Sequence, residues 1–194
     1  MHKTSKMKKH YLATFFLLVC IAAKAQYVTI PDNDFRNFLQ TKYPSCFNIA
    51  GQMNSSCPAI VQEDTLVLNI STFNYVNLDG IQYFISLKYL DCSGTQIAST
   101  PALPATLKYL DMSSTGENAV SNFFPSMPAG LQYLLCNDNF LSSFPNALPS
   151  TLKYLDCSNN SFSLLSSFPA GLDTLICKNQ LQYSPLTHVL TSIT

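Results

Sequence analysis

Cysteine is the residue type whose number and spacing could give this chain a chemical activity. Four of the seven cysteines recur at a regular interval, as Cys92, Cys136, Cys157 and Cys177. Thiolates bind zinc and act as nucleophiles, so a metal centre or a redox site is one interpretation of this set. Such a site would have to use His188, because the other two histidines lie within the first ten residues.

The position of these cysteines favours a structural role instead. Each takes a consensus leucine position of a repeat that runs through the chain, and Met112 takes the same position in another copy. A buried cysteine behaves as a small hydrophobic side chain, and its thiol is usually inert. No pair of carboxylates stands out as an acid and a base beyond those that the repeat itself fixes. We therefore expect no enzymatic activity, no metal site and no cofactor.

The repeat that positions these residues has a period of about 20 residues. Its copies share the pattern Leu-x-x-Leu-x-(Cys/Met)-x-x-(Asn/Thr) and begin at Leu87, Leu107, Leu131, Leu152 and Leu172. This period and pattern are typical of a leucine-rich repeat. Since a single copy cannot bury its own apolar edge, the copies must stack into a solenoid.

Each copy predicts a short strand followed by an extended segment. Alternation along the strand sends residues such as Leu90 and Cys92 inward and the residues between them outward. Prolines such as Pro101 and Pro104 disfavour a helix in the second half and favour extended or polyproline-like backbone. We expect a curved solenoid of short parallel strands on the concave face, extended convex segments and a small helical N-terminal cap.

Asparagine stands where the chain turns out of the strand in two of the copies, at Asn139 and Asn160. An asparagine amide has both donors and acceptors, so it can bind the backbone of neighbouring turns. Thr95 and Thr115 take this position in two other copies, and a hydroxyl offers only one donor. We expect this part of the ladder to be weaker.

The sequence divides into residues 1–25, 26–63 and 64–194. The first part has the features of a secretory signal peptide: four lysines, an apolar stretch over Tyr11–Ala23 and an A-x-A cleavage site ending at Ala25. A lipoprotein modified at Cys20 is the alternative, disfavoured because Val19 is not a small residue. The apolar stretch is short for a bilayer span, and no later segment is longer, so we expect a secreted or cell-surface chain without a membrane span after cleavage.

The remaining residues are acidic. Without residues 1–25 the chain keeps six of its eleven Lys and Arg and all eleven Asp and Glu, a net charge of −5. A basic stripe is the usual feature of a nucleic-acid-binding surface, so we expect no nucleic-acid partner.

Residues 26–63 do not fit the repeat and are expected to form the N-terminal cap. A helix is expected to begin near Asp32, to carry Phe35, Phe38 and Leu39 on one apolar stripe, and to end before Pro44. The nearby Cys46 and Cys57 are expected to form a disulfide, because they lie close together in an exported chain. The segment that they enclose is expected to be a loop.

Residues 64–194 are expected to hold about six repeats, with an unfinished seventh at the C-terminus. The longest copy has extra residues around 116–119, which we expect to bulge from one rim as a loop.

The repeats resemble a bacterial class with the pattern L-P-x-L-P-x-x-L, seen here over Leu103–Leu110 and Leu148–Leu155. The stretches Ile30–Phe35, Tyr43–Cys46 and Asp79–Ile81 are similar to exported leucine-rich-repeat proteins of bacteria, many of which reach the cell surface by type IX secretion. The resemblance covers about residues 27–194 and implies a binding scaffold. Related proteins often carry a C-terminal sorting domain or, in secreted effectors, a ubiquitin-ligase domain, and neither stands in these residues.

Three sets of side chains on the strands are the candidate ligand-binding residues of the concave face. They are the column Tyr89, Tyr109, Tyr133, Tyr154 and Thr174, the acidic residues Asp91, Asp111 and Asp156, and the basic residues Lys88, Lys108 and Lys153. Tyrosine offers a large, stiff contact area with a polar end, which suits recognition. Strands also favour tyrosine, and repeats copy residues without selection for binding, so a structural role remains open.

The function that follows is an exported, non-catalytic scaffold that binds a protein or glycan ligand through its concave face. Two alternatives stay open. The chain could be a structural spacer of a cell-surface layer, or the N-terminal fragment of a larger secreted enzyme or effector.

Overall fold

The computed structural model describes residues 26–70, 75–115, 127–144, 147–162 and 168–180. The expected signal peptide, the expected loop at residues 116–119 and the unfinished seventh repeat lie outside these residues.

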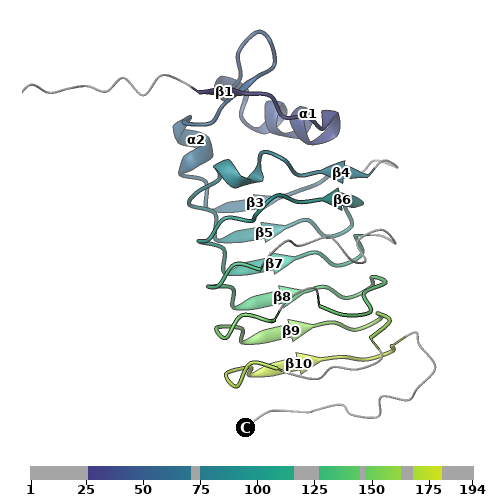
Figure 1. The fold of residues 1–194 in the computed structure, drawn as a ribbon. Helices are drawn as coiled ribbons and strands as arrows, with labels where there is room; N and C mark the ends of the chain where they lie inside the picture. Colours follow the sequence, from purple (N-terminus) through teal and green to yellow (C-terminus); the bar gives the residue numbers. More distant parts are fainter. Residues whose placement is uncertain (1–25, 71–74, 116–126, 145–146, 163–167, 181–194) are drawn as a thin grey trace, which may run out of the picture.

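The described chain is a stack of short parallel strands with a small cap over one end (Figure 1). Six strands form one sheet in the order β10-β9-β8-β7-β5-β3, and each pairs in parallel with its neighbour. Their bounds are β3 Thr65–Val67, β5 Tyr89–Asp91, β7 Tyr109–Asp111, β8 Tyr133–Leu135, β9 Tyr154–Asp156 and β10 Thr174–Ile176. The predicted sheet of short parallel strands is confirmed.

The cap is built on helix α1, Asn33–Lys42. A carboxylate oxygen of Asp32 caps it by accepting the N–H of Phe35 at 2.9 Å. Phe35 and Leu39 are fully buried, and Phe38 packs against the core from a partly buried position. The amphipathic helix predicted from the sequence is therefore present, and its apolar stripe covers the end of the solenoid.

The rest of the cap is more regular than the sequence suggests. Strand β1, Tyr27–Val28, pairs antiparallel with β2, Met53–Asn54, inside the segment that was expected to be a loop. The 3₁₀-helix η1, Pro44–Cys46, and the short helix α2, Pro58–Val61, carry the two cysteines toward each other. The pairing of β1 with β2 joins residues about 25 positions apart in the sequence, so local sequence patterns do not predict it.

Gly80 lets the cap pack closely on the first repeat. Its φ is +127°, and a Cβ placed there would lie 2.6 Å from Cδ1 of Ile30 and 3.4 Å from the ring of Phe35. Only glycine has both the backbone freedom and the small size that this contact requires. Gly80 precedes the 3₁₀-helix η2, Ile81–Tyr83.

The segments opposite the main sheet are extended, as the prolines predict. Two of them pair: β4, Val76–Asn77, lies parallel to β6, Ile97–Ser99. This two-stranded sheet was not predicted, because it depends on how closely two neighbouring segments approach.

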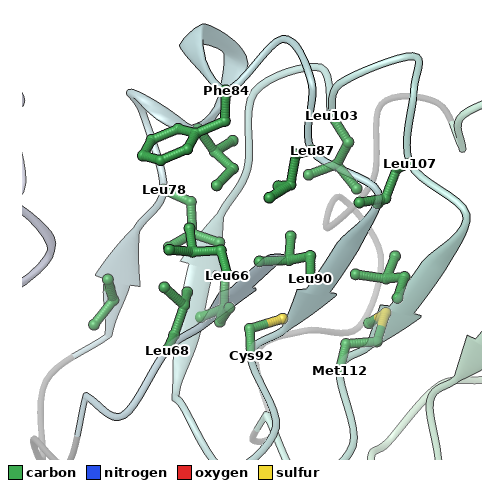
Figure 2. Close-up of a cluster of buried hydrophobic side chains, with 14 of the residues drawn as sticks. Leu66, Leu68, Leu78, Phe84, Leu87, Leu90, Cys92, Leu103, Leu107 and Met112 are labelled. Atoms are coloured by element: carbon green, nitrogen blue, oxygen red, sulfur yellow. The ribbon is translucent and has the colours of Figure 1, made fainter. Parts of the chain in front are cut away.

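The hydrophobic core fills the space between the main sheet and the segments opposite (Figure 2). Each strand contributes an inward leucine and, two residues on, a second inward side chain. Buried examples are Leu66 and Leu68, Leu90 and Cys92, and Leu110 and Met112. The strands therefore have one side fixed by packing and one side turned to solvent.

Buried asparagines connect successive turns, as predicted. Nδ2 of Asn139 donates to the carbonyls of Met112 at 2.9 Å and Cys136 at 3.0 Å, while its Oδ1 accepts the N–H of Thr115 at 2.9 Å. One turn further along, Nδ2 of Asn160 donates to the carbonyls of Cys136 and Cys157, and its Oδ1 accepts the N–H of Leu141. Each amide thus satisfies backbone groups of two turns that would otherwise be buried without partners.

The threonines at the equivalent position make fewer bonds. The hydroxyl of Thr95 lies 3.4 Å from the carbonyl of Leu68. The hydroxyl of Thr115 lies 3.1 Å from the carbonyl of Met112 and 3.0 Å from Oδ1 of Asn139, and its one proton can serve only one of them at a time. The final described turn uses Gln180, whose Nε2 donates to the carbonyl of Cys157 at 3.0 Å.

Candidate functional site

The outward side chains of the six strands form the candidate site, which we name the sheet face. The register of the strands places Thr65, Tyr89, Tyr109, Tyr133, Tyr154 and Thr174 side by side in one column. A second column, two residues on, holds Val67, Asp91, Asp111, Leu135, Asp156 and Ile176. Thr65 and Val67 extend both columns by one strand and were missed, because the first repeat is irregular in sequence.

The four tyrosine rings form an unbroken row. The rings of Tyr89 and Tyr109 are stacked, with centroids 4.2 Å apart and planes 8° from parallel. The next two steps, from Tyr109 to Tyr133 and from Tyr133 to Tyr154, have centroids 6.2 Å and 6.3 Å apart with planes tilted by 32° and 31°. Tyr133 is the most exposed of the four, with 43% of its surface accessible.

Two phenols of this row, those of Tyr109 and Tyr154, have a raised pKa. Burial raises the pKa of Tyr109, and the neighbouring Tyr89 and the carboxylates of Asp111 and Asp91 raise it further. Burial and the Asp156 carboxylate also raise the pKa of Tyr154. A protonated phenol offers both a donor and an acceptor to a ligand.

The aspartates of the second column each use one oxygen to shape the turn after the strand. Oδ1 of Asp91 accepts the N–H of Ser93 at 2.9 Å and its hydroxyl at 2.7 Å. Asp111 binds Ser113 in the same way, and Oδ1 of Asp156 accepts the N–H of Ser158. Within the described part of the chain, no hydrogen bond or ion pair involves Oδ2 of these three residues. They therefore combine a structural role with one free carboxylate oxygen each.

The lysines lie elsewhere than expected. Nζ of Lys108 donates to the carbonyl of Gly130 at 3.1 Å, and Nζ of Lys153 donates to that of Gly171 at 2.9 Å. Nζ of Lys88 lies 3.5 Å from a carboxylate oxygen of Asp64. The lysines precede the tyrosines by one residue, so alternation does not place them on the same side of the strand. They connect successive turns at the rim instead of edging the tyrosine row.

Glycine and threonine alternate at the rim turns that these lysines reach. A Cβ on Gly130 would lie 2.6 Å from Nζ of Lys108, so the glycine makes room for the ammonium group. Where threonine replaces glycine, its hydroxyl reaches back to the preceding turn: Thr106 donates to the carbonyl of Leu87 and Thr151 to that of Leu131. In the sequence, these contacts between turns are indicated by the alternation of Thr-Leu-Lys with Gly-Leu.

The repeated cysteines lie on the interior side of the strands. Cys92, Cys136 and Cys157 are buried, whereas Cys177, in the last described turn, is only partly buried. Burial raises the pKa of the first three thiols well above the ordinary value, and nearby carboxylates and thiols raise it further. A buried, protonated thiol is a weak nucleophile.

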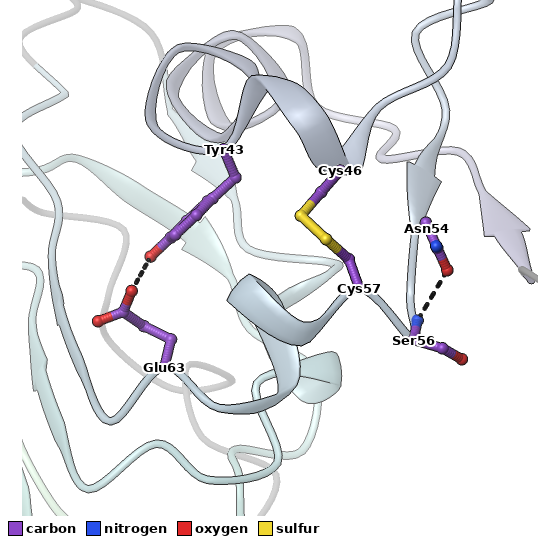
Figure 3. The surroundings of a disulfide bond; sticks show 6 residues. All are labelled: Tyr43, Cys46, Asn54, Ser56, Cys57 and Glu63. Carbon is purple, nitrogen blue, oxygen red and sulfur yellow. Dashed lines mark hydrogen bonds between the residues drawn. A yellow bond between two sulfur atoms is a disulfide. The ribbon is translucent and has the colours of Figure 1, made fainter.

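The other two cysteines are joined in the cap. A disulfide links Cys46 to Cys57, whose Cα atoms are 5.6 Å apart (Figure 3). Beside it, the hydroxyl of Tyr43 donates to Oε2 of Glu63 at 2.8 Å, which connects the end of α1 to the segment that leads into β3. Burial, together with this carboxylate, raises the pKa of the Tyr43 phenol.

An open groove of about 650 Å³ lies between the cap helix α1 and strand β3, the first strand of the main sheet. It is lined by Asp34, Asn37, Phe38, Thr41 and Lys42 of α1 and by Val67, Asn69 and Ile70. Val67 also begins the second column of the sheet face, so the groove adjoins that column. Sequence patterns could not find it, because it exists only where the cap meets the sheet.

Neither a metal cluster nor a spanning helix is found in the described ranges. Among those residues, no group of three or more His, Cys, Asp or Glu side chains is placed to hold a metal ion. No helix there is long and apolar enough to cross a bilayer.

Residues 151–175 match the protein-family model described as Leucine Rich Repeat. No curated protein matches the sequence. Among solved structures, the leucine-rich-repeat domain of a Shigella effector is similar, with a TM-score of 0.52 and 25% identity over 67% of this chain and 56% of that one. YopM from Yersinia enterocolitica has a TM-score of 0.37 and 30% identity over 50% of this chain and 25% of its own.

This chain thus spans about half the length of the Shigella domain and a quarter of YopM. The parallel sheet, the repeat period and the matched repeat give the same answer about architecture. The fold is a leucine-rich-repeat solenoid, an architecture that suits a protein-binding scaffold.

Proposed function

We propose that this chain is an exported, non-catalytic module that binds a protein ligand through the sheet face. The observation that carries the proposal is the tyrosine row, in which four rings in register form one continuous surface beside a column of carboxylates. Solenoids present such extended surfaces for binding, and buried tyrosines are frequent energetic centres of protein interfaces. The likeness to the domain of a Shigella effector supports a role in recognition.

The test of the binding face uses the central pair of tyrosines. The variant Tyr109→Ala with Tyr133→Ala removes the middle of the row without touching the interior side of the strands. A control, Tyr27→Ala with Tyr75→Ala, removes two tyrosines, 46% and 41% exposed, that lie off the sheet face. Each protein is applied to arrays of purified proteins and of glycans, and its thermal midpoint is recorded.

A ligand of the sheet face should bind the wild type and the control equally and the Tyr109/Tyr133 variant at least tenfold more weakly, because an anchor residue contributes about 1–2 kcal/mol or more. The thermal midpoint of this variant should fall by several degrees, because the two truncations remove the stacked contact with Tyr89 and the two tilted ring contacts but leave the interior side of the strands unchanged. Equal binding by all three proteins would contradict the proposal. A stable protein that binds nothing on either array would favour a structural spacer.

Export is the second part of the proposal, supported by the features of residues 1–25 and by the Cys46–Cys57 pair. Disulfides persist in oxidising compartments and are rare in the cytosol. Peptide mapping without reductant, on protein recovered from cells that express the full sequence, should find the two cysteines joined and an N-terminus at Gln26. Free thiols at both positions, or an intact N-terminus, would contradict export.

A further inference from the structure

The orientation of the tyrosine rings restricts what the sheet face can bind. The faces of Tyr89 and Tyr109 cover each other, because their planes are nearly parallel and their centroids are 4.2 Å apart. Solvent therefore meets ring edges and hydroxyls along this pair, while the electron-rich faces are turned to the next ring. Sugar rings and cations that stack on aromatic groups need an exposed face. This pair is better suited to hydrogen bonding through its hydroxyls than to stacking.

The neighbouring carboxylates are placed close together without a counter-charge. Asp91 and Asp111 are directly opposite each other in adjacent parallel strands, about 4.8 Å apart. Like charges in this position destabilise a sheet. Asp156 lies two strands further on, beyond Leu135. All three keep Oδ2 free of hydrogen bonds and ion pairs within the described ranges, so no counter-charge there offsets the repulsion between Asp91 and Asp111.

The basic residues of the same repeats do not supply the missing charge. Lys88 pairs with Asp64, and Lys153 binds the carbonyl of Gly171 with Asp173 at 3.8 Å. Lys108 is bonded to the carbonyl of Gly130. These ammonium groups connect turns at the start of the strands, whereas the three aspartates stand at the ends of the strands. None of these three lysines is paired with the acidic column, so its carboxylates are open to a cation from another molecule.

We propose that the ligand is a protein segment with arginine or lysine side chains, lying across the strands so that its cations pair with Asp91, Asp111 and Asp156 while the tyrosine hydroxyls bind its polar groups. This inference rests on the proposed function and adds the chemistry of the partner. Electrostatic complementarity of this kind determines which partners an interface accepts. Arginine suits the site best, since its planar group can bind a carboxylate oxygen and a phenol oxygen together.

The strand spacing specifies a probe. Asp111 and Asp156 are two strands apart, which is about 9.6 Å. A polyproline II segment has three residues per turn and a rise of about 3.1 Å, so every third side chain lies on one side, about 9.3 Å from the last. Four repeats of Arg-Pro-Pro can therefore place successive arginines at Asp111 and Asp156, with Asp91 one strand from the first of them. Four repeats of Glu-Pro-Pro, and an arginine peptide of the same composition with its arginines clustered, are the control peptides.

Fluorescence anisotropy measures how tightly these labelled peptides bind three proteins. The proteins are the wild type, the double variant Asp91→Asn with Asp111→Asn, and the double variant Asp64→Asn with Asp173→Asn. The two double variants lose the same charge, but Asp64 and Asp173 precede strands β3 and β10 and lie outside the acidic column. Asparagine keeps the oxygen that Ser93 and Ser113 bind. We expect the Arg-Pro-Pro peptide to bind the wild type and the Asp64/Asp173 variant, and to bind the Asp91/Asp111 variant at least tenfold more weakly. The thermal midpoint of that variant should be equal or higher, because the repulsion is removed.

Equal loss of binding in both double variants, or equal binding of the clustered and spaced peptides, would overturn the inference in favour of unspecific charge attraction. A glycan or an uncharged protein that depends on Tyr109 and Tyr133 but not on Asp91 and Asp111 would overturn it and leave the proposed function standing. The absence of any ligand that depends on the two tyrosines would overturn both.

Discussion

The two sides of the same six strands differ in how completely their side chains are buried and hydrogen-bonded within the protein. On the interior side, Leu90 and Cys92 are buried against neighbouring repeats, and no buried side-chain nitrogen or oxygen among the described residues lacks a partner. On the sheet face, Tyr89 and Asp91 are only partly buried, and the carboxylate keeps a free oxygen. The same short strand thus has an interior side whose groups are fully packed and hydrogen-bonded, and an outward side whose polar groups can still bind a ligand.

This difference separates stability from recognition within a single repeat. Changes on the interior side create cavities or leave buried polar groups without partners, both of which are costly. Changes on the sheet face remove contacts that water can largely replace. Measurements that compare the two sides therefore test whether the sheet face is free for binding.

The largest effect expected on the interior side comes from alkaline pH. Since burial raises the pKa of the Cys92, Cys136 and Cys157 thiols above the ordinary value of 9.0, the unfolded chain releases protons that the folded chain keeps. Stability is fully present below pH 9 and falls as the pH rises above it. Between pH 8 and pH 10 each thiol should remove about 1.4 kcal/mol and the three together about 4 kcal/mol from the free energy of unfolding.

Urea unfolding at pH 8, 9 and 10 measures this loss. Between pH 8 and pH 10, the free energy of unfolding of Cys136→Ala should fall by about one third less than that of the wild type. Each protein is compared with its own value at pH 8. An unchanged loss would show that the thiols do not cause the pH dependence.

The asparagine ladder gives the next largest effect. Asn139→Ala removes the acceptor of the Thr115 N–H and the donors to two buried carbonyls, so we expect a loss of about 3 kcal/mol in the free energy of unfolding. Thr95→Ala removes a single long hydrogen bond and should lose about 1 kcal/mol or less. Urea unfolding of both variants at neutral pH is the measurement, and equal losses would contradict a ladder that is stronger at its asparagines.

On the sheet face, the stacked pair of tyrosines should make a smaller contribution. Tyr89→Ala removes a stacked ring at 4.2 Å and should lower the free energy of unfolding by about 1 kcal/mol. Tyr154→Ala removes only a tilted contact at 6.3 Å and should lower it by about 0.5 kcal/mol. Thermal unfolding of the two variants measures the difference. Losses as large as that of Asn139→Ala would make the tyrosine row part of the structural framework.

The smallest effect concerns the turn that leaves the strand. Gly94, Ser114, Asp138, Asn159 and Asn179 occupy one repeat position, and all have φ between 52° and 69°. Serine tolerates this left-handed region less well than asparagine or glycine. Ser114→Asn should therefore raise the free energy of unfolding by about 0.5 kcal/mol. Ser143→Asn, at an exposed position outside that region, is the control and should leave the free energy of unfolding unchanged. An equal increase in this variant would show that the left-handed backbone at Ser114 is not the cause.

The sequence by itself determined the period, the number of strands and the side of the strand on which the leucines, cysteines and tyrosines lie, although it misplaced the lysines. Alternation along a strand is a local property, and copies at a nearly constant interval come into register when they stack. For this reason the tyrosine row, the inward cysteines and the asparagine ladder could all be predicted from spacing alone. The cap helix followed from Asp32 and the apolar stripe for the same local reason.

The tertiary structure decided how these side chains are oriented and which neighbours they bind. The stacking of Tyr89 on Tyr109, the reach of Lys108 to Gly130 and the use of Gln180 in place of asparagine depend on distances between turns about 20 residues apart. So do the pairing of β4 with β6 and the groove between α1 and Val67. A repeat pattern records which residue types occupy equivalent positions, but a hydrogen bond or a ring contact forms only when the separation and angle between two particular side chains allow it.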